Sequence, residues 1–355
     1  MMKKTLIAAG VAAAMAIPAI AAADVQLSAQ LQAELFSVSG DPRNGTNMNG
    51  KGLYIGDAIE EGGDINSGNW SRVDLRASHD LGNGLTGYAH LSANPNITTG
   101  NALGASREVL VGLRGAFGDL SVGRMASAYG TAGKDPFNAT FMQARGNGGQ
   151  LGGFQGLGNG SYVNNAIGYK NKFEMVSLNA TLGLDQSANT DALSEDNNGQ
   201  HMYALRVNVD LSPVEVWVAH TNADEYGQAT RTRPIDTNFQ ATKLGAQFKT
   251  GAFGVVGQYE NIKHDTAGVD TNYAGNFYML SGTYSMGANT FMLGFGQFSA
   301  ENDDRDQQWI AAGMRHAFNR NVSIHGGVRQ TEYDLGAADT GNKETVVGAG
   351  MRVTF

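Results

Sequence analysis

Residues 25–35 read Val-Gln-Leu-Ser-Ala-Gln-Leu-Gln-Ala-Glu-Leu, with apolar side chains at the odd positions and polar ones at the even positions. A period of two places the apolar set on one face of a β-strand and the polar set on the other. The end of the chain repeats the pattern, because Val347, Ala349, Met351, Val353 and Phe355 alternate with glycine and polar residues. Both ends are therefore predicted to be strands with one apolar face.

The alternation recurs between these ends, and sixteen segments are predicted to be strands. They are residues 25–38, 69–80, 85–93, 107–115, 119–126, 162–170, 173–185, 201–211, 214–222, 239–250, 253–262, 276–286, 289–299, 307–318, 321–332 and 344–355. The links alternate between tight turns, such as 81–84, and long polar segments, such as 40–68 and 127–161. An even number of long amphipathic strands with links of two classes favours an all-β transmembrane barrel, closed because hydrocarbon leaves no strand edge satisfied. A soluble β-sandwich or β-helix is the alternative, but its strands are usually only about 5–6 residues long.

Composition excludes several other classes. The 355 residues include 49 glycines and no cysteine, and 41% are hydrophobic, so a disulfide scaffold and a disordered chain are excluded. A mean hydropathy of −0.27 is too polar for a bundle of membrane helices. The net charge is −8, and no basic tract is present, so nucleic acid is not a predicted partner.

The first residues are predicted to be a secretory signal peptide. Met1-Met2-Lys3-Lys4 is a basic start, and the apolar, Ala-rich stretch after it ends at Ala23. An N-terminal membrane anchor is the alternative, disfavoured because the apolar part is short and Pro18 interrupts it. Removal of residues 1–23 would leave residues 24–355 as one barrel domain with a net charge of −10.

Three stretches resemble a known family. Residues 70–85, Trp-Ser-Arg-Val-Asp-Leu-Arg-Ala-Ser-His-Asp-Leu-Gly-Asn-Gly-Leu, resemble the second strand, first periplasmic turn and third strand of general Gram-negative porins. Residues 111–124, Val-Gly-Leu-Arg-Gly-Ala-Phe-Gly-Asp-Leu-Ser-Val-Gly-Arg, resemble the stretch before their constriction loop, and residues 350–355, Gly-Met-Arg-Val-Thr-Phe, resemble their closing strand. The pattern is most like that of the neisserial and burkholderial porins.

The resemblance implies a sixteen-stranded antiparallel barrel in the outer membrane that forms a homotrimer. It also implies one water-filled pore per subunit, narrowed by an inward-folded third extracellular loop, for passive diffusion of small hydrophilic solutes and ions. The barrel would contact outer-membrane lipid and lipopolysaccharide, and Phe355 would be the signal for the outer-membrane assembly machinery. In a barrel of this size the polar faces surround an aqueous lumen, since the apolar faces meet lipid.

The constriction is expected between the loop 125–161 and the wall opposite. The loop holds one acid, Asp135, against Lys134 and Arg145, whereas relatives that prefer cations carry several acids there. We therefore expect a weakly anion-preferring or nearly non-selective pore. The candidate pore-lining residues are Arg72, Arg76, Arg114, Arg124, Lys134, Asp135 and Arg145.

Arg124 is included because it matches the family motif, but its phase is awkward. It alternates with Leu120 and Val122, which should face lipid. A bulge at Gly123, or a strand end that already lies above the membrane, would resolve the conflict. The arginines could also do no more than pair with Asp74 and Glu108.

Other sites are weakly indicated. The outer loops carry acids that suit a solvated rim or cation bridges to lipopolysaccharide, but Asn302-Asp303-Asp304-Arg305-Asp306 lacks calcium-loop spacing. The seven histidines form no metal-binding pair, so no metal or cofactor is predicted. An outer-membrane barrel enzyme, a protease or lipase, is a further alternative, disfavoured because no Gly-x-Ser-x-Gly occurs and such barrels tend to be smaller. A channel specific for sugar or phosphate remains the alternative function, because the predicted lumen aromatics Tyr88, Trp217 and Trp309 are too widely spaced to decide.

Overall fold

A computed structural model of the chain describes residues 24–40, 51–56, 71–97, 100–104, 106–144, 162–184, 201–224, 237–266, 274–301, 306–333 and 342–355. Over these ranges the backbone forms strands, turns and bends, and no helix long and apolar enough to cross a membrane is found in them. The predicted signal peptide, residues 1–23, lies outside the described residues.

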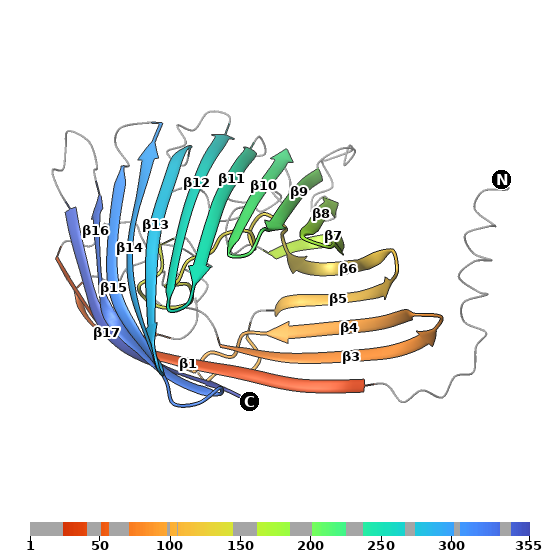
Figure 1. The fold of residues 1–355 in the computed structure, drawn as a ribbon, viewed down its shortest axis with the longest axis horizontal. Coiled ribbons are helices and arrows are strands. Elements are labelled where there is room, and N and C mark those ends of the chain that lie inside the picture. Colours follow the sequence, from red (N-terminus) through yellow and green to blue (C-terminus); the bar gives the residue numbers. More distant parts are fainter. Residues whose placement is uncertain are drawn as a thin grey trace, which may run out of the picture.

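Seventeen strands form one antiparallel sheet (Figure 1). They are β1 (Asp24–Gly40), β2 (Gly52–Gly56), β3 (Arg72–Gly82), β4 (Leu85–Ala93), β5 (Ser106–Gly115), β6 (Gly118–Ala126), β7 (Tyr162–Phe173), β8 (Val176–Leu184), β9 (His201–Asp210), β10 (Val214–Asp224), β11 (Thr237–Thr250), β12 (Phe253–Thr266), β13 (Gly275–Met286), β14 (Asn289–Ala300), β15 (Gln307–Ala317), β16 (Val322–Tyr333) and β17 (Asn342–Thr354).

The sheet closes through its first strand. On one edge β1 pairs with β17, from Gln30 opposite Thr354 to Gly40 opposite Glu344. On the other edge it pairs with β3 through residues 24–30 and with β2 through residues 34–38. β2 and β3 pair with the same edge of β1, one after the other along it, so the two count as one strand around the barrel. The seventeen strands therefore make a sixteen-stranded barrel. The predicted sixteen-stranded closed antiparallel barrel is confirmed.

Strand β2 was not expected, since the link 40–68 was predicted to be a loop. Its five residues, Gly-Leu-Tyr-Ile-Gly, are too few to show an alternation against the glycines around them. The turn between β7 and β8 also differs from the prediction. It lies at Glu174 and Met175, and Glu174 adopts a positive φ of 49° without the Gly or Asn signal that usually marks such a position.

The two ends of the described chain are joined at the short-turn end of the barrel. The Ala29 amide donates to the Phe355 carbonyl at 2.8 Å, and the Phe355 amide donates back to Ala29 at 2.9 Å. These bonds bring the last residue into the sheet beside the first strand. The side chain of Phe355 itself is 67% exposed.

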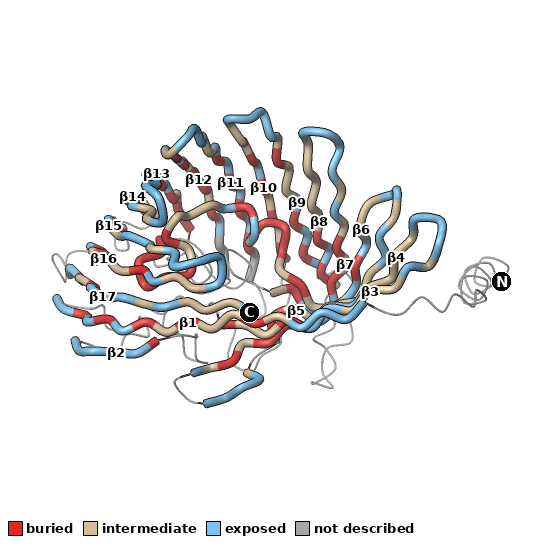
Figure 2. Tube along the Cα trace, turned by 60° about the horizontal axis from the view of Figure 1, so that its bottom comes forward, coloured by how far each residue is buried: buried red, intermediate tan, exposed pale blue. Residues whose placement is uncertain are grey.

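The apolar face of the barrel points outward. Leu27, Val111, Leu280 and Leu293 are each about 60–73% exposed, and buried positions alternate with exposed ones along β13–β15 (Figure 2). An exposed apolar belt of this kind suits lipid. The buried core lies on the other, polar face of the sheet, where strand residues meet the segment that follows β6.

Candidate functional site

The described part of the long link after β6 packs against the polar face of the sheet. We call residues 127–144 the loop segment. Asp135 holds its fold, because one carboxylate oxygen accepts the Phe137 amide at 2.9 Å and the other accepts the Ala144 amide at 2.8 Å. Both carboxylate oxygens of Asp135, which was predicted to line the pore, therefore accept hydrogen bonds from backbone amides of the loop segment.

The first part of the loop segment is held by a buried cluster of polar side chains on β11 and β12. The hydroxyl of Tyr129 donates to Glu260 on β12, and the Lys243 ammonium on β11 lies 4.2 Å from the centre of the Tyr129 ring. Lys243 also donates to the Tyr129 carbonyl at 3.3 Å and lies 4.0 Å from Glu260. The side chains of Lys243 and Glu260 are fully buried, so each compensates the charge of the other.

The far end of the loop segment is fixed by β1, β16 and β17. Glu34 accepts the Phe141 amide at 3.1 Å and a hydrogen bond from His325 at 2.7 Å. Arg329 donates to the Phe141 carbonyl at 2.8 Å and forms an ion pair with Glu344, both side chains being fully buried. A single residue of the loop segment thus has both backbone groups satisfied by charged side chains.

A neighbouring carbonyl is held in the same way. Gln32 on β1 donates to Ala139 at 2.7 Å, and Arg352 on β17 donates to the same oxygen at 3.1 Å. On the opposite side of the barrel, the Ala128 amide donates to Thr181 on β8 at 3.0 Å, and Arg206 on β9 donates to the Thr131 carbonyl at 2.7 Å. The loop segment is therefore hydrogen-bonded to strands from β8 round to β1, which we call the covered arc.

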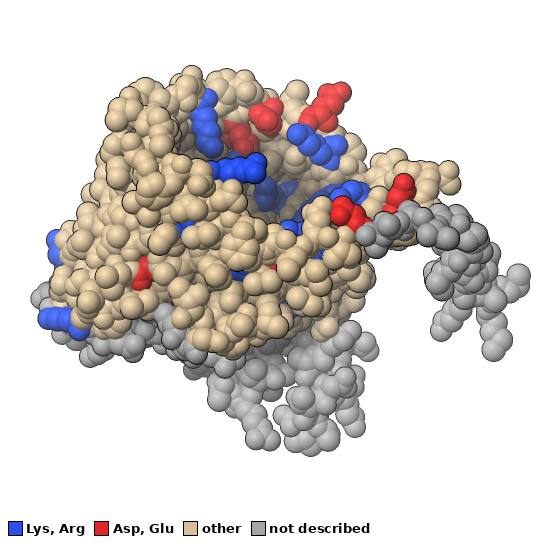
Figure 3. Space-filling model, turned by 90° about the horizontal axis from the view of Figure 1, so that it is seen from below, with Lys and Arg blue, Asp and Glu red and all other residues tan. Residues whose placement is uncertain are grey.

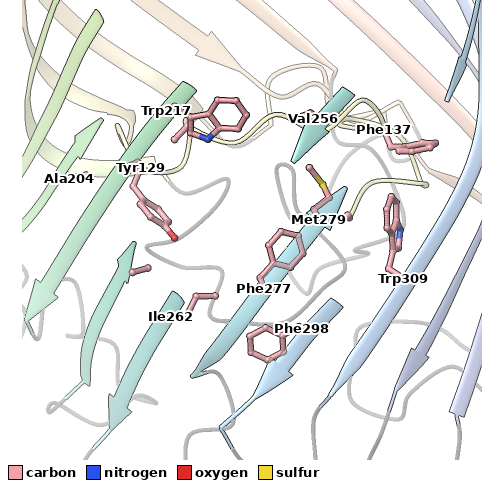
Figure 4. Packing of buried hydrophobic residues seen from close by; sticks show 14 of the residues in the cluster. Tyr129, Phe137, Ala204, Trp217, Val256, Ile262, Phe277, Met279, Phe298 and Trp309 are labelled. Atoms are coloured by element: carbon pink, nitrogen blue, oxygen red, sulfur yellow. The ribbon is translucent and has the colours of Figure 1, made fainter. Parts of the chain in front are cut away.

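Apolar packing completes the covered arc. Phe137 meets Trp309 edge-to-face, with ring centres 5.5 Å apart, and Figure 4 shows Tyr129 and Phe137 among side chains that come from the strands. Glycines make room for this layer, because a Cβ at Gly327 would come within 2.5 Å of the Met142 sulfur. A Cβ at Gly245 would lie 2.1 Å from the Trp217 ring. Part of the high glycine content therefore serves to seat large side chains inside the barrel.

The remaining arc, from β3 to β7, carries charged side chains that we call the open wall. They are Arg72, Asp74, Arg76, His90, Glu108, Arg114 and Asp119. Asp74 is at the centre, 3.2 Å from the Arg72 Nε and 3.4 Å from an Arg76 nitrogen. The Asp74 carboxylate is almost buried, whereas Arg76 is 49% exposed. The structure therefore brings Arg72 and Arg76 together around one acid.

Arg114 forms a second group beside the first. Its Nε and Nη2 donate to Asp119 at 3.0 and 2.8 Å, and its guanidinium lies 5.1 Å from the centre of the Tyr88 ring. The arginine side chain is still 62% exposed. It lines a cavity of about 380 Å³ shared with Arg76 and another of about 620 Å³ shared with Lys170.

Lys134 faces the covered arc. It forms an ion pair with Glu215 on β10, donates to Gln247 at 3.3 Å and lies 5.5 Å from the centre of the Trp217 ring. Its charge is compensated there. Lys134 and Asp135 line a cavity of about 560 Å³ together with Lys249 and Arg315. Figure 3 shows Lys and Arg side chains around the hollow of the barrel, with Asp and Glu side chains among them.

Arg124 lies apart from the open wall. The pairing of β6 with β7 does shift between Gly123 and Met125, and Gly123 has a positive φ of 140°. On its other edge, however, β6 stays in register, so that Arg124 stands opposite Val109, which is 42% exposed on the apolar face. Side chains of directly opposed residues share a face. The bulge therefore does not turn Arg124 toward the arginines of the open wall.

The contacts of Arg124 agree with this placement. Its Nε donates to the Ser106 carbonyl at 3.1 Å, and its guanidinium also donates to Asn164 and lies 5.3 Å from the centre of the Tyr162 ring. These neighbours belong to the strand ends that border the long links. Arg145, the last predicted pore residue, lies outside the described residues.

Sequence reasoning missed most of the side chains that organise the site. Alternation placed Glu34, His325 and Arg329 on the polar face, but nothing in their spacing showed that they hold the loop segment. His90 and Lys170 have no motif around them that could have singled them out. Within the described ranges, no group of three or more His, Asp or Glu side chains is arranged to hold a metal ion.

Most of the outer-loop acids lie outside the described residues. They are Asp57, Glu60, Glu61, Asp64, Asp191, Glu195, Asp196, Glu225, Asp303 and Asp304. Asp306, which is described, accepts the Ala300 amide at 2.8 Å and so closes the link after β14. The two alternatives for these acids, a solvated rim and cation bridges to lipopolysaccharide, both stay open.

Comparison with known proteins gives consistent results. A family model described as Gram-negative porin matches residues 8–336. The major outer membrane protein P.IB of Neisseria meningitidis serogroup B is 31% identical over 126 residues, which are 36% of this chain and 34% of that protein. The match thus spans about a third of the length of this curated relative.

Solved structures match over almost the whole chain. The anion-selective porin from Comamonas acidovorans has a TM-score of 0.73 and 19% identity, covering 94% of this chain and 100% of its own. The outer membrane channel DcaP of Acinetobacter baumannii has a TM-score of 0.65 and 12% identity, covering 96% and 99%. OmpT of Vibrio cholerae, in its trimer form, has a TM-score of 0.63 and 14% identity, covering 94% and 100%. At these identities the likeness establishes a shared fold.

Proposed function

The chain belongs to the Gram-negative porin family and is a multi-pass β-barrel of the outer membrane, and from this premise we propose that it lets small hydrophilic solutes and ions diffuse passively through a water-filled channel. The observation that carries the proposal is the open wall. It presents exposed charged side chains to cavities on the inner face of a closed barrel whose other strands are covered by the loop segment. A barrel of sixteen strands is wide enough to leave an aqueous path there.

We propose that the link 127–161 is the third extracellular loop and that it folds inward to narrow the channel. The support is the set of hydrogen bonds from the described loop segment to strands on widely separated parts of the barrel. A segment tied to β8, β9, β16 and β1 at once crosses the interior. The narrowest ring would then lie between it and the open wall.

For selectivity, we propose a weak preference for anions or near neutrality. The acid of the loop segment, Asp135, is engaged by two backbone amides, and Arg76 and Arg114 are about half exposed or more. The charge that solutes meet at the narrow part is thus mainly that of the wall. The similar barrel from Comamonas acidovorans is an anion-selective porin, which agrees with this sign.

Planar-bilayer recording tests the proposal. Purified protein should give large ohmic current steps, and the reversal potential in a salt gradient should show equal permeabilities or a modest excess for chloride over potassium. Absence of channel steps at high protein concentration would contradict the proposed function. A clear cation preference would contradict only the proposed selectivity.

We further propose a homotrimer, by analogy with the trimer form of the similar OmpT barrel, so that conductance steps should come in groups of three. Residues 1–23 are proposed to be removed as a signal peptide. Phe355 is proposed as the mark read by the assembly machinery, and lipid with lipopolysaccharide would surround the exposed apolar belt.

A channel specific for sugar has less support. Stacking of sugar rings needs accessible aromatic faces along the path, and Trp217 and Trp309 are each only 1% exposed because the loop segment packs on them. The family and the fold indicate a channel and not an enzyme. Concentration-dependent block of the current by a single sugar or by phosphate would favour the specific channel instead.

A further inference from the structure

A histidine of the open wall contacts an acid through each of its ring nitrogens. The Nε2 of His90 lies 2.9 Å from the Asp74 carboxylate, and its Nδ1 lies 3.2 Å from the Glu108 carboxylate. The imidazole is 11% exposed and lines the cavity of about 380 Å³. A neutral imidazole has one donor and one acceptor nitrogen, whereas an imidazolium has two donors. Two carboxylate partners therefore match the charged ring.

We propose that His90 is held as an imidazolium and is the residue that decides the sign of charge selection at the open wall, which makes the selectivity of the channel depend on pH. The proposal rests on the proposed function, since it assumes that ions pass this wall. It adds a residue and a pH dependence that follow from the contacts of His90.

The contacts of Asp74 and Glu108 favour the ionised form of both carboxyl groups. Asp74 also receives the Arg72 and Arg76 guanidinium groups at 3.2 and 3.4 Å. The other oxygen of Glu108 accepts the Ala126 amide at 3.5 Å. Because imidazole is a stronger base than a carboxylate, the proton shared within this group belongs on the His90 ring. The arrangement is a cation between two anions and not a protonated acid beside a neutral ring.

The other charges around His90 cancel one another, so the proton on His90 sets the net charge of this wall. The charged and titratable groups that face the cavity, or that contact Asp74 or Glu108, lie on β4, the strand of His90, and on five other strands. They are Asp24 on β1, Arg72, Asp74 and Arg76 on β3, Tyr88 on β4, Glu108 and Arg114 on β5, Asp119 on β6 and Lys170 on β7. The four cationic side chains equal the four acidic ones. The wall is therefore net positive when His90 is charged and neutral when it is not.

The expected size of the effect follows from Coulomb's law. A unit charge about 9 Å from a passing ion, in water with a Debye length of about 10 Å, attracts the anion and repels the cation equally, so the ratio of anion to cation permeability changes by about two-fold. Loss of the His90 proton also leaves one of the two carboxylates without its donor. Both changes favour cations, so the preference for anions should fall as the pH rises.

The experiment measures the reversal potential of the full-length channel in a potassium chloride gradient at about pH 5.5 and at about pH 9. In the wild type the chloride-to-potassium permeability ratio should fall by about two-fold between the two. His90→Gln should lose this fall and resemble the alkaline wild type throughout. His90→Lys places a fixed cation at the same position, and it should lose the fall and resemble the acidic wild type.

His220→Gln is the matched control. His220 lies on the apolar face, bonded to Thr242 at 2.8 Å, so its variant should keep the wild-type dependence. The same fall in His90→Gln as in the wild type would overturn the inference, as would a pH-independent wild type or a two-fold fall in His90→Lys. If one His90 variant does not assemble, the other decides. If the His90→Gln channel conducts but keeps the wild-type dependence of its permeability ratio on pH, only this inference is refuted. Absence of conductance in the wild type refutes the proposed function.

Discussion

The covered arc and the open wall are built from the same alternation, yet their inward charges have different surroundings. In the covered arc the side chains of Lys243, Glu260, Arg329 and Glu344 are fully buried beneath the loop segment. In the open wall Arg114 is 62% exposed and faces a cavity. The inward charges of these two regions therefore differ in whether they are buried against the loop segment or face open space.

The difference has an energetic cause. A charge removed from water must be paired and hydrogen-bonded, or it destabilises the fold by several kcal/mol. The buried ions of the covered arc are paired, since Arg329 has Glu344 and the Phe141 carbonyl as partners. In the same way Lys243 has Glu260 and the Tyr129 carbonyl. The Arg329 Nε and the Glu344 Oε2 are buried and make no hydrogen bond among the described residues, so this pair has little stability to spare if one partner is removed. The exposed arginines keep their hydration and need only weak pairing. Substitutions in the two regions should accordingly act on different measurements.

The largest effect is expected from Arg329→Met. The change leaves Glu344 buried without its cation and removes the donor to the Phe141 carbonyl, at a cost of about 3 kcal/mol or more. The loop segment should lose one anchor, so single-channel conductance and current noise should rise. The urea midpoint in detergent, followed by the mobility shift between folded and unfolded bands, measures the loss of stability.

The same two strands provide the control. Lys343 on β17 pairs with Glu332 on β16, and both are about half exposed. Lys343→Met removes an ion pair between the same strands and should cost less than about 1 kcal/mol, with unchanged conductance. Equal losses in the two variants would mean that the covered arc does not differ from the surface in this respect.

A smaller loss is expected from Gly245→Ala. Its added Cβ would lie 2.1 Å from the Trp217 ring, and the ring is confined by Lys134 at 5.5 Å. Overpacking of this kind costs about 1–3 kcal/mol. Gly257→Ala on the next strand is the control, since its nearest neighbour atom would be 3.9 Å away. A urea midpoint in Gly245→Ala no lower than that of the control would show that the covered arc tolerates repacking.

The open wall should respond in selectivity and not in stability. Arg114→Gln removes one exposed cation and leaves Asp119 bonded to the Tyr88 hydroxyl. The chloride-to-potassium permeability ratio should fall by about two-fold, while the urea midpoint stays within error of the wild type. Reversal potentials measure the first quantity. A large drop in stability with no change in selectivity would assign Arg114 to the anchoring group instead.

Sequence alone could predict the barrel because the period of two is a local property that each strand carries by itself. It assigned Glu34, Arg329 and Arg114 to the inner face by the same rule. It could not tell which of them anchors the loop segment, since that depends on contacts between residues more than a hundred positions apart, such as Gln32 with Ala139. Lys134 was expected at the pore for its charge, but its partner Glu215 is set by where the loop segment packs against the covered arc.

The smallest effect is expected from Arg124→Gln, which tests how far a motif can replace geometry. The motif groups Arg124 with Arg114, whereas the register of β5 and β6 puts it opposite Val109 on the apolar face. A charge on the outside of the wall is separated from the lumen by the sheet and is screened by salt over about 10 Å. The permeability ratio of Arg124→Gln should therefore match the wild type in the same reversal-potential measurement. A shift as large as that of Arg114→Gln would mean that the strand end turns Arg124 inward in the assembled channel, and the open wall would then extend to the rim.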